Sequence, residues 1–104
     1  MPEGSPLWGA RVGNVSPALT QEYSIANVEK GVVVLQLAAN SPASFNGIRP
    51  RDVVREVNGT EIIDTKQLEN EVTRNARSWQ FVVERGGELL VFERRGGFLR
   101  QFRR

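Results

Sequence analysis

The chain of 104 residues is long enough for one domain with a modest hydrophobic core. It contains neither cysteine nor histidine, which excludes disulfides, the usual zinc sites and histidine-dependent catalysis. The net charge of +2 conceals an asymmetry, because five arginines and no acid lie in residues 94–104, so any attraction to nucleic acid or anionic lipid would be confined to that tail.

The first residues, 1–6, are expected to form a linker, and they lack the basic start and apolar centre of a signal peptide. No apolar run approaches the roughly 18 residues that cross a bilayer, so the chain is expected to be soluble. Leu7-Trp8-Gly9-Ala10 then leads into a strand expected over Arg11 to Val15. Glycine between apolar residues lets successive N–H groups point into one anion-holding concavity, although an ordinary loop entering a strand explains the same residues.

Two Ser-Pro pairs each predict a short helix, because serine caps free N–H groups and proline fits the first helical position. The first pair, Ser16-Pro17, is expected to begin a helix that ends near Tyr23. The second, Ser41-Pro42, is expected to begin a helix of scarcely two turns that ends at Gly47. Between them, Gly31 to Leu37 is β-branched and apolar at successive positions, which predicts a strand buried on both faces.

The second half of the chain is predicted to hold a further strand and a longer helix. Val53 to Val57 has the composition of a strand and ends at Asn58-Gly59, a strong turn signal. An extended conformation resumes over Thr60 to Ile63. Asp64 is then expected to cap a helix, with Gln67 placed three residues on to reach back to the capping residue.

The helix that Asp64 is predicted to cap carries one apolar stripe, because Leu68, Val72 and Ala76 recur at a spacing of four. No helix breaker appears before Asn75, so this helix is expected to be the longest in the chain. Most of the stripe is expected to be core.

The last part of the chain has the pattern of a β-hairpin. Gly86-Gly87 is a two-residue connection between strands expected over Trp79 to Glu84 and Leu89 to Phe92. A final, shorter strand is expected over Phe98 to Phe102. The chain as a whole is therefore predicted to be a β-rich α+β domain of five or six strands, two short helices and one longer helix, curled into a partly open barrel.

The order of these motifs resembles the PDZ domain that follows the protease domain in bacterial HtrA (Do-like) serine proteases. Leu7-Trp8-Gly9-Ala10 is similar to the family's apolar-x-glycine-apolar carboxylate loop, and Ser41 through Val54 resembles its "SPA…AGL-x-x-GD" core. Asn58-Gly59 and Arg85-Gly86-Gly87 are similar to its turn and its closing hairpin. The sequence departs from the pattern where Asn46 and Arg51 replace the usual small residue and glycine, and the similarity covers residues 7–93.

The resemblance implies a peptide-binding function. PDZ domains bind extended peptides by adding them as a strand to an exposed edge, here Ala10 to Val15, while the loop N–H groups of Trp8, Gly9 and Ala10 would hold a terminal carboxylate. The helix from Thr65 would form the opposite wall. Taken singly, its apolar residues are more often core, and the charged residues on both walls are more often solvated surface. The residues that the resemblance places at the peptide are Leu7, Trp8, Gly9, Ala10, Arg11, Val12, Thr65, Leu68, Glu69 and Val72.

The resemblance also implies a setting in proteolysis and protein quality control. The chain would be the non-catalytic C-terminal PDZ domain of a periplasmic serine protease, and it would capture polypeptide C-termini or unfolded protein segments for an attached protease domain. The serines have no histidine to activate them and the carboxylates show no metal-ligand spacing, so neither cofactor nor metal is expected.

An alternative is a groove closed by the chain itself, for example by insertion of Phe98 to Phe102, in a domain that tethers neighbouring domains or subunits of a homo-oligomer. Nucleic-acid or membrane binding by the arginines of residues 94–104 is disfavoured, because the body of the domain offers no basic face.

Overall fold

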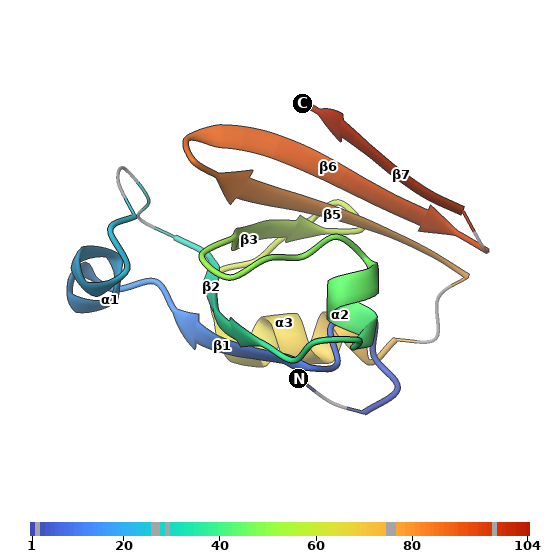
Figure 1. The fold of residues 1–104 in the computed structure, drawn as a ribbon, viewed down its shortest axis with the longest axis horizontal. Helices are drawn as coiled ribbons and strands as arrows, with labels where there is room; N and C mark the ends of the chain where they lie inside the picture. Colours follow the sequence, from blue (N-terminus) through green and yellow to red (C-terminus); the bar gives the residue numbers. More distant parts are fainter. Residues whose placement is uncertain (2, 26–27, 29, 75–76, 97) are drawn as a thin grey trace.

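The computed structural model describes residues 1, 3–25, 28, 30–74, 77–96 and 98–104. In these residues one sheet runs in the order β1-β2-β3-β5-β6-β7, with β4 paired to β3. β1 and β7 lie at opposite ends of this sheet, and the N-terminus lies beside β1 (Figure 1). The strands are β1 (Ala10–Asn14), β2 (Val32–Leu37), β3 (Val53–Val57), β4 (Thr60–Glu61), β5 (Ser78–Arg85), β6 (Glu88–Arg95) and β7 (Phe98–Arg103).

Seven strands are present in the described part of the chain, more than the five or six expected. The additional strand is β4, since the extended stretch after Asn58-Gly59 pairs back onto β3 for two residues. β5 and β6 are also longer than predicted, because their pairing continues from the Gly86-Gly87 turn to Ser78 opposite Arg95. The β-rich α+β architecture that the sequence predicts is confirmed.

Three helices begin at the capping residues that the sequence predicts. In α1 (Pro17–Glu22), α2 (Pro42–Phe45) and α3 (Thr65–Val72), the side chains of Ser16, Ser41 and Asp64 each accept a first-turn N–H. α1 has no buried residue and projects from one end of the molecule (Figure 1), whereas α3 packs on β1 and β3.

Two details of the α3 prediction are wrong. Gln67 does not reach back to the Asp64 N–H: its side chain accepts the N–H of Ile63 at 2.8 Å and donates to the carbonyl of Glu61. The helix ends at Val72, with Thr73 as its C-cap; the hydroxyl of Thr73 donates to the carbonyl of Asn70. The predicted stripe residue Ala76 and the predicted limit Asn75 lie outside the described residues.

The prediction that β2 is buried on both faces is right only for its first half. Val32, Val33 and Val34 are buried at successive positions, in the half that pairs with β1 on one side and β3 on the other. The second half has only β1 as a partner, and Gln36 in it is exposed.

The core lies between the sheet and α3. It joins Leu68 and Val72 of α3 to Phe81 and Phe92 of the central strands, and Leu7 contributes from the segment before β1. None of the described helices has the length and apolar character needed to cross a membrane.

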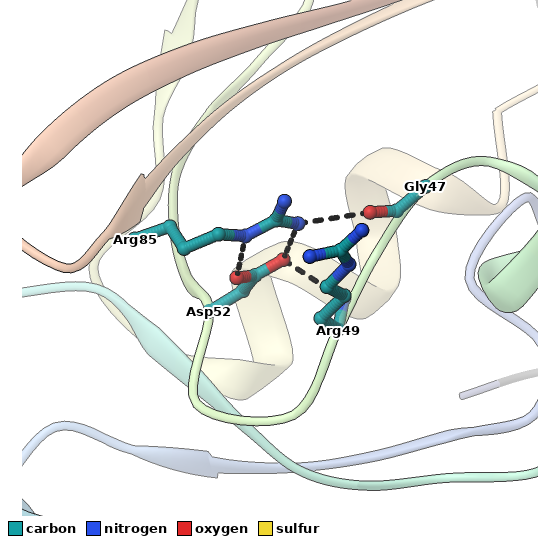
Figure 2. Close-up of polar contacts among 4 residues, drawn as sticks. All are labelled: Gly47, Arg49, Asp52 and Arg85. Atoms are coloured by element: carbon teal, nitrogen blue, oxygen red, sulfur yellow. Dashed lines mark hydrogen bonds and ion pairs between the residues drawn. The ribbon is translucent and has the colours of Figure 1, made fainter.

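A buried ion pair fixes the turn between α2 and β3 (Figure 2). Both Asp52 carboxylate oxygens accept from the Arg85 guanidinium at 2.8 Å, and Arg85 also donates to the carbonyl of Gly47. The hydrogen bond to Asp52 raises the pKa of Arg85. Arg51, in the glycine position of the motif, takes the left-handed conformation with φ of 75°, so the turn keeps the geometry that glycine would favour.

Candidate functional site

A groove of about 500 Å³ lies between β1 and α3. β1 is the end strand of the sheet, so its outer edge is paired with no other strand of the described sheet (Figure 1). An unpaired edge presents backbone N–H and C=O groups to which an extended chain can bind. The described residues that line the groove are Met1, Ala10, Arg11, Val12, Thr65 and Glu69.

The two walls of this groove are joined by a hydrogen bond where α3 begins. The backbone N–H of Thr65 donates to the side-chain oxygen of Asn14, the last residue of β1, at 2.7 Å. The bond satisfies a free N–H in the first turn of α3 and ties that end of the helix to the edge strand. Asn14 is not among the residues that the sequence predicts at the peptide, and its only signal is a polar amide near the end of a predicted strand.

The loop that precedes β1 is held by α2 and the residues around it. The carbonyls of Trp8 and Gly9 accept the N–H groups of Ala43 and Ala38 at 3.1 Å and 2.8 Å. The side chain of Asn46, which is 4% exposed, donates to the carbonyl of Pro6 at 2.8 Å. The position of the loop is therefore determined by contacts with residues more than 28 positions away.

The surroundings of Gly9 give a second reason for glycine at this position. A Cβ at this position would lie 2.2 Å from the Cβ of Ser41, and Gly9 has a φ of 101°. Glycine is therefore required here by close packing against the start of α2 and by the backbone conformation.

The loop N–H groups are engaged within the segment before β1. The Trp8 N–H donates to the carbonyl of Ser5 at 3.2 Å, and the Ala10 N–H donates to the carbonyl of Leu7 at 3.0 Å. Two of the three N–H groups that were expected to hold a carboxylate are thus occupied in this conformation. A carboxylate would have to displace these bonds.

The structure brings together five of the ten predicted peptide-binding residues, which line the groove: Ala10, Arg11, Val12, Thr65 and Glu69. Leu7, Leu68 and Val72 are at most 1% exposed and belong to the core, in agreement with the alternative interpretation of the two helix residues. Trp8 is 44% exposed and is not among the residues that line the groove.

The alternative in which Phe98 to Phe102 fills the groove is not what the structure shows. These residues lie in β7, which pairs with β6 at the opposite edge of the sheet. Arg94 and Arg95, grouped with the basic tail in the sequence, belong to β6, and Arg94 contacts the side chain of Asn46. Among the residues that the structure describes, no group of three or more acidic side chains could hold a metal ion.

The sequence model of the PDZ domain family matches residues 9–93. Serine protease HTRA3 from Rattus norvegicus is 33% identical over 89 residues, which cover 81% of this chain and 19% of the relative. A probable periplasmic serine endoprotease, DegP-like, from Hahella chejuensis is 31% identical over 86 residues, which cover 80% of this chain and 18% of the relative. The chain thus spans about a fifth of the length of these relatives.

Two solved structures have the same fold. The HtrA3 PDZ domain bound to a phage-derived ligand (FGRWV) has a TM-score of 0.71 and 27% identity, and the match covers 89% of this chain and 85% of that chain. The HtrA-type protease AlgW with a decapeptide has a TM-score of 0.72 and 24% identity, and the match covers 92% of this chain and 28% of that chain.

Proposed function

The chain belongs to the PDZ domain family, and from that premise we propose that it binds extended polypeptide segments by adding them as a strand to the free edge of β1. A PDZ domain is a non-catalytic binding module. The observation that supports this binding mode is the groove between β1 and α3, which runs beside an unpaired strand edge. The HtrA3 PDZ domain, a relative in fold and sequence, was solved with a peptide ligand.

The groove residues contribute to peptide recognition in two ways, through the backbone and through charged side chains. The backbone of Ala10 to Val12 offers the hydrogen bonds of a strand edge, and these contribute affinity for any extended chain. Arg11 and Glu69 are exposed on opposite walls, where they select charge along the peptide. An exposed charge pair contributes only about 0–1 kcal/mol, so these two residues tune selectivity more than affinity.

A peptide carboxylate would bind at the loop formed by Trp8, Gly9 and Ala10. The carbonyls of Trp8 and Gly9 are already held by residues near α2, so the backbone of the loop is oriented before a ligand arrives. The N–H groups of Trp8 and Ala10 become available when their bonds to Ser5 and Leu7 break. Hydrogen bonds to a charged group are stronger than the neutral ones that they replace, which favours the exchange.

We place this module in a larger serine protease of the HtrA and DegP-like type, as its C-terminal PDZ domain. The DegP-like relatives are probable periplasmic endoproteases, and we propose the same compartment for this chain. Captured segments of unfolded proteins would then be held close to a protease domain in the same polypeptide, at a high effective concentration.

The test is a titration of the isotope-labelled chain with a peptide that ends in valine, followed by NMR. We expect shifts at Ala10 to Val12 and at Thr65 to Glu69, and no shifts in β7. Amidation of the peptide terminus should weaken binding roughly tenfold or more, because it removes a charge-assisted hydrogen bond of about 1.5–3 kcal/mol. Unchanged groove resonances at saturating peptide would overturn the proposal, and equal affinity of the amidated peptide would remove the carboxylate from it.

A further inference from the structure

Met1 lies inside the groove that the proposed function assigns to a peptide. Its amino group donates to the carbonyl of Ala10 at 2.9 Å. Its side chain is partly buried against the core, and it lines the groove together with residues of β1 and α3. The strand edge therefore already has a hydrogen-bond donor at Ala10.

A second contact comes from the same part of the chain. The carbonyl of Ser5 accepts the Trp8 N–H at 3.2 Å. Two of the backbone groups that a bound peptide would use, the Ala10 carbonyl and the Trp8 N–H, are thus engaged by residues that precede the loop. Glu3, Gly4 and Ser5 also line a neighbouring cavity of about 300 Å³ with Val72, so these residues pass beside the C-terminal end of α3.

We propose that the N-terminal segment, defined as residues 1 and 3–5, is an internal ligand that must leave the groove before a peptide binds. This inference rests on the proposed function, because it concerns the regulation of the same groove. The contact with Ala10 needs one N–H donor and no charge, so a backbone amide at the position of the Met1 amino group would make it equally well. Occupation of the groove lowers the apparent affinity for peptide in proportion to the fraction of molecules that are open.

One feature of the N-terminal segment favours its release from the groove. The hydroxyl oxygen of Ser5 is buried and has no hydrogen-bond partner among the described residues. A buried polar group without a partner disfavours the conformation that buries it. Release would return this hydroxyl to water and at the same time free the Trp8 N–H. This cost favours release of the segment, and a peptide with a terminal carboxylate shifts the balance further toward the open state.

The first experiment needs no peptide. Met1 is the only methionine of the chain, so ¹³C-methyl labelling of methionine gives a single resonance. We expect nuclear Overhauser contacts from this methyl group to Ala10 and Val12, and a shift away from the position of a free peptide. A Met1 methyl resonance at the free-peptide position, without these contacts, would overturn the proposal whether or not the groove binds a ligand.

The second experiment measures affinity for the valine-ending peptide in three proteins: the 104-residue chain, the chain without residues 1–4, and Met1→Ser made by cleavage of a fusion partner. We expect the deletion to bind roughly tenfold more tightly and Met1→Ser to fall between. Met1→Ser keeps the backbone donor, so it remains informative if the deletion is poorly folded. Leu99→Ser in β7 is the matched control, with unchanged affinity.

The possible outcomes separate the two proposals. Equal dissociation constants for all three proteins would overturn the internal ligand. Absence of binding in all three proteins, including the one without residues 1–4, would overturn the proposed function, because the groove would then take no peptide even when it is uncovered. The Met1 methyl resonance of the 104-residue chain tests the internal contact separately.

Discussion

At the scale of the residue, Gly9 is a position where the addition of one methyl group should have a large effect on stability. In Gly9→Ala the new Cβ would meet the Cβ of Ser41 at 2.2 Å, at a φ of 101°. The left-handed conformation costs an L-residue roughly 1–2 kcal/mol, and overpacking adds about 1–3 kcal/mol. We expect the free energy of unfolding, measured by urea denaturation, to fall by about 2–5 kcal/mol in total.

The control for Gly9→Ala is Gly59→Ala. Gly59 also has a left-handed φ, of 82°, but nothing lies within 4 Å of the position of its Cβ. Only the conformational cost of roughly 1–2 kcal/mol should appear there. Equal losses in the two variants would show that the contact with Ser41 is not what requires glycine in the loop.

The ion pair of Asp52 and Arg85 should contribute strongly to the stability of the fold. Asp52 is fully buried, so Arg85→Met would leave its carboxylate without a cationic partner and should cost about 3–5 kcal/mol. Arg55→Met is the matched control: its pair with Glu84 has a similar distance of 2.7 Å, but both side chains are more exposed than those of Arg85 and Asp52, so a smaller loss of about 1 kcal/mol is expected. Similar losses in guanidinium denaturation would contradict the prediction.

The pKa of Arg85 determines how this cost varies with pH. The hydrogen bond to Asp52 raises that pKa in the folded protein, so the contribution of Arg85 is complete below the unfolded pKa and is lost only as pH rises through the higher folded value. Both values lie in strongly alkaline solution. Titration of Arg85 should therefore cause no difference between neutral and mildly alkaline pH.

At the scale of the element, the two N-caps of α1 and α3 are chemically similar, but their removal should lower the free energy of unfolding by different amounts. Asp64 caps α3, which carries the buried residues Leu68 and Val72, so Asp64→Ala should lower the free energy of unfolding by about 1 kcal/mol. Ser16 caps α1, which has no buried residue, so Ser16→Ala should fray that helix and leave global unfolding almost unchanged. Hydrogen exchange would locate the fraying, and a global loss as large as that of Asp64→Ala would contradict this view of α1.

The same elements show what the sequence can predict. Helix starts at Ser16, Ser41 and Asp64 follow from local capping chemistry, and the turn at Asn58-Gly59 follows from two adjacent residues. The end of α3 at Val72 does not, because neither proline nor glycine marks it in the sequence.

The candidate site is also only partly predictable from the sequence. The order of motifs predicts an edge strand facing a helix, and the structure places Ala10 and Thr65 on those two walls. The support of the loop is not predictable from local patterns, because Asn46 bonds to Pro6, 40 positions earlier, and to Arg94, 48 positions later. The contact of Met1 with Ala10 likewise requires the chain to fold back on itself.

At the scale of the whole molecule, the sheet has two ends with different roles. The end at β1 bears the groove and is covered by the N-terminal segment. The end at β7 bears exposed arginines and Phe98, which is 83% exposed. Arginine on an edge strand discourages pairing with further strands of like charge. Strand addition is therefore expected at β1 rather than at β7, although both are edges of the same sheet.

Removal of residues 96–104 tests whether the two ends are independent. The deletion takes away β7 with its six residue pairs to β6 and the partly buried Phe102, so the free energy of unfolding should fall by about 1–3 kcal/mol. Because β7 lies at the far end of the sheet from β1, the affinity for the valine-ending peptide should stay within about twofold. Fluorescence titration and urea denaturation of the same preparation measure both quantities. If the affinity rises as much as is expected on removing residues 1–4, β7 also controls access to the groove. If stability falls and the affinity is unchanged, β7 contributes to the stability of the fold and not to peptide binding.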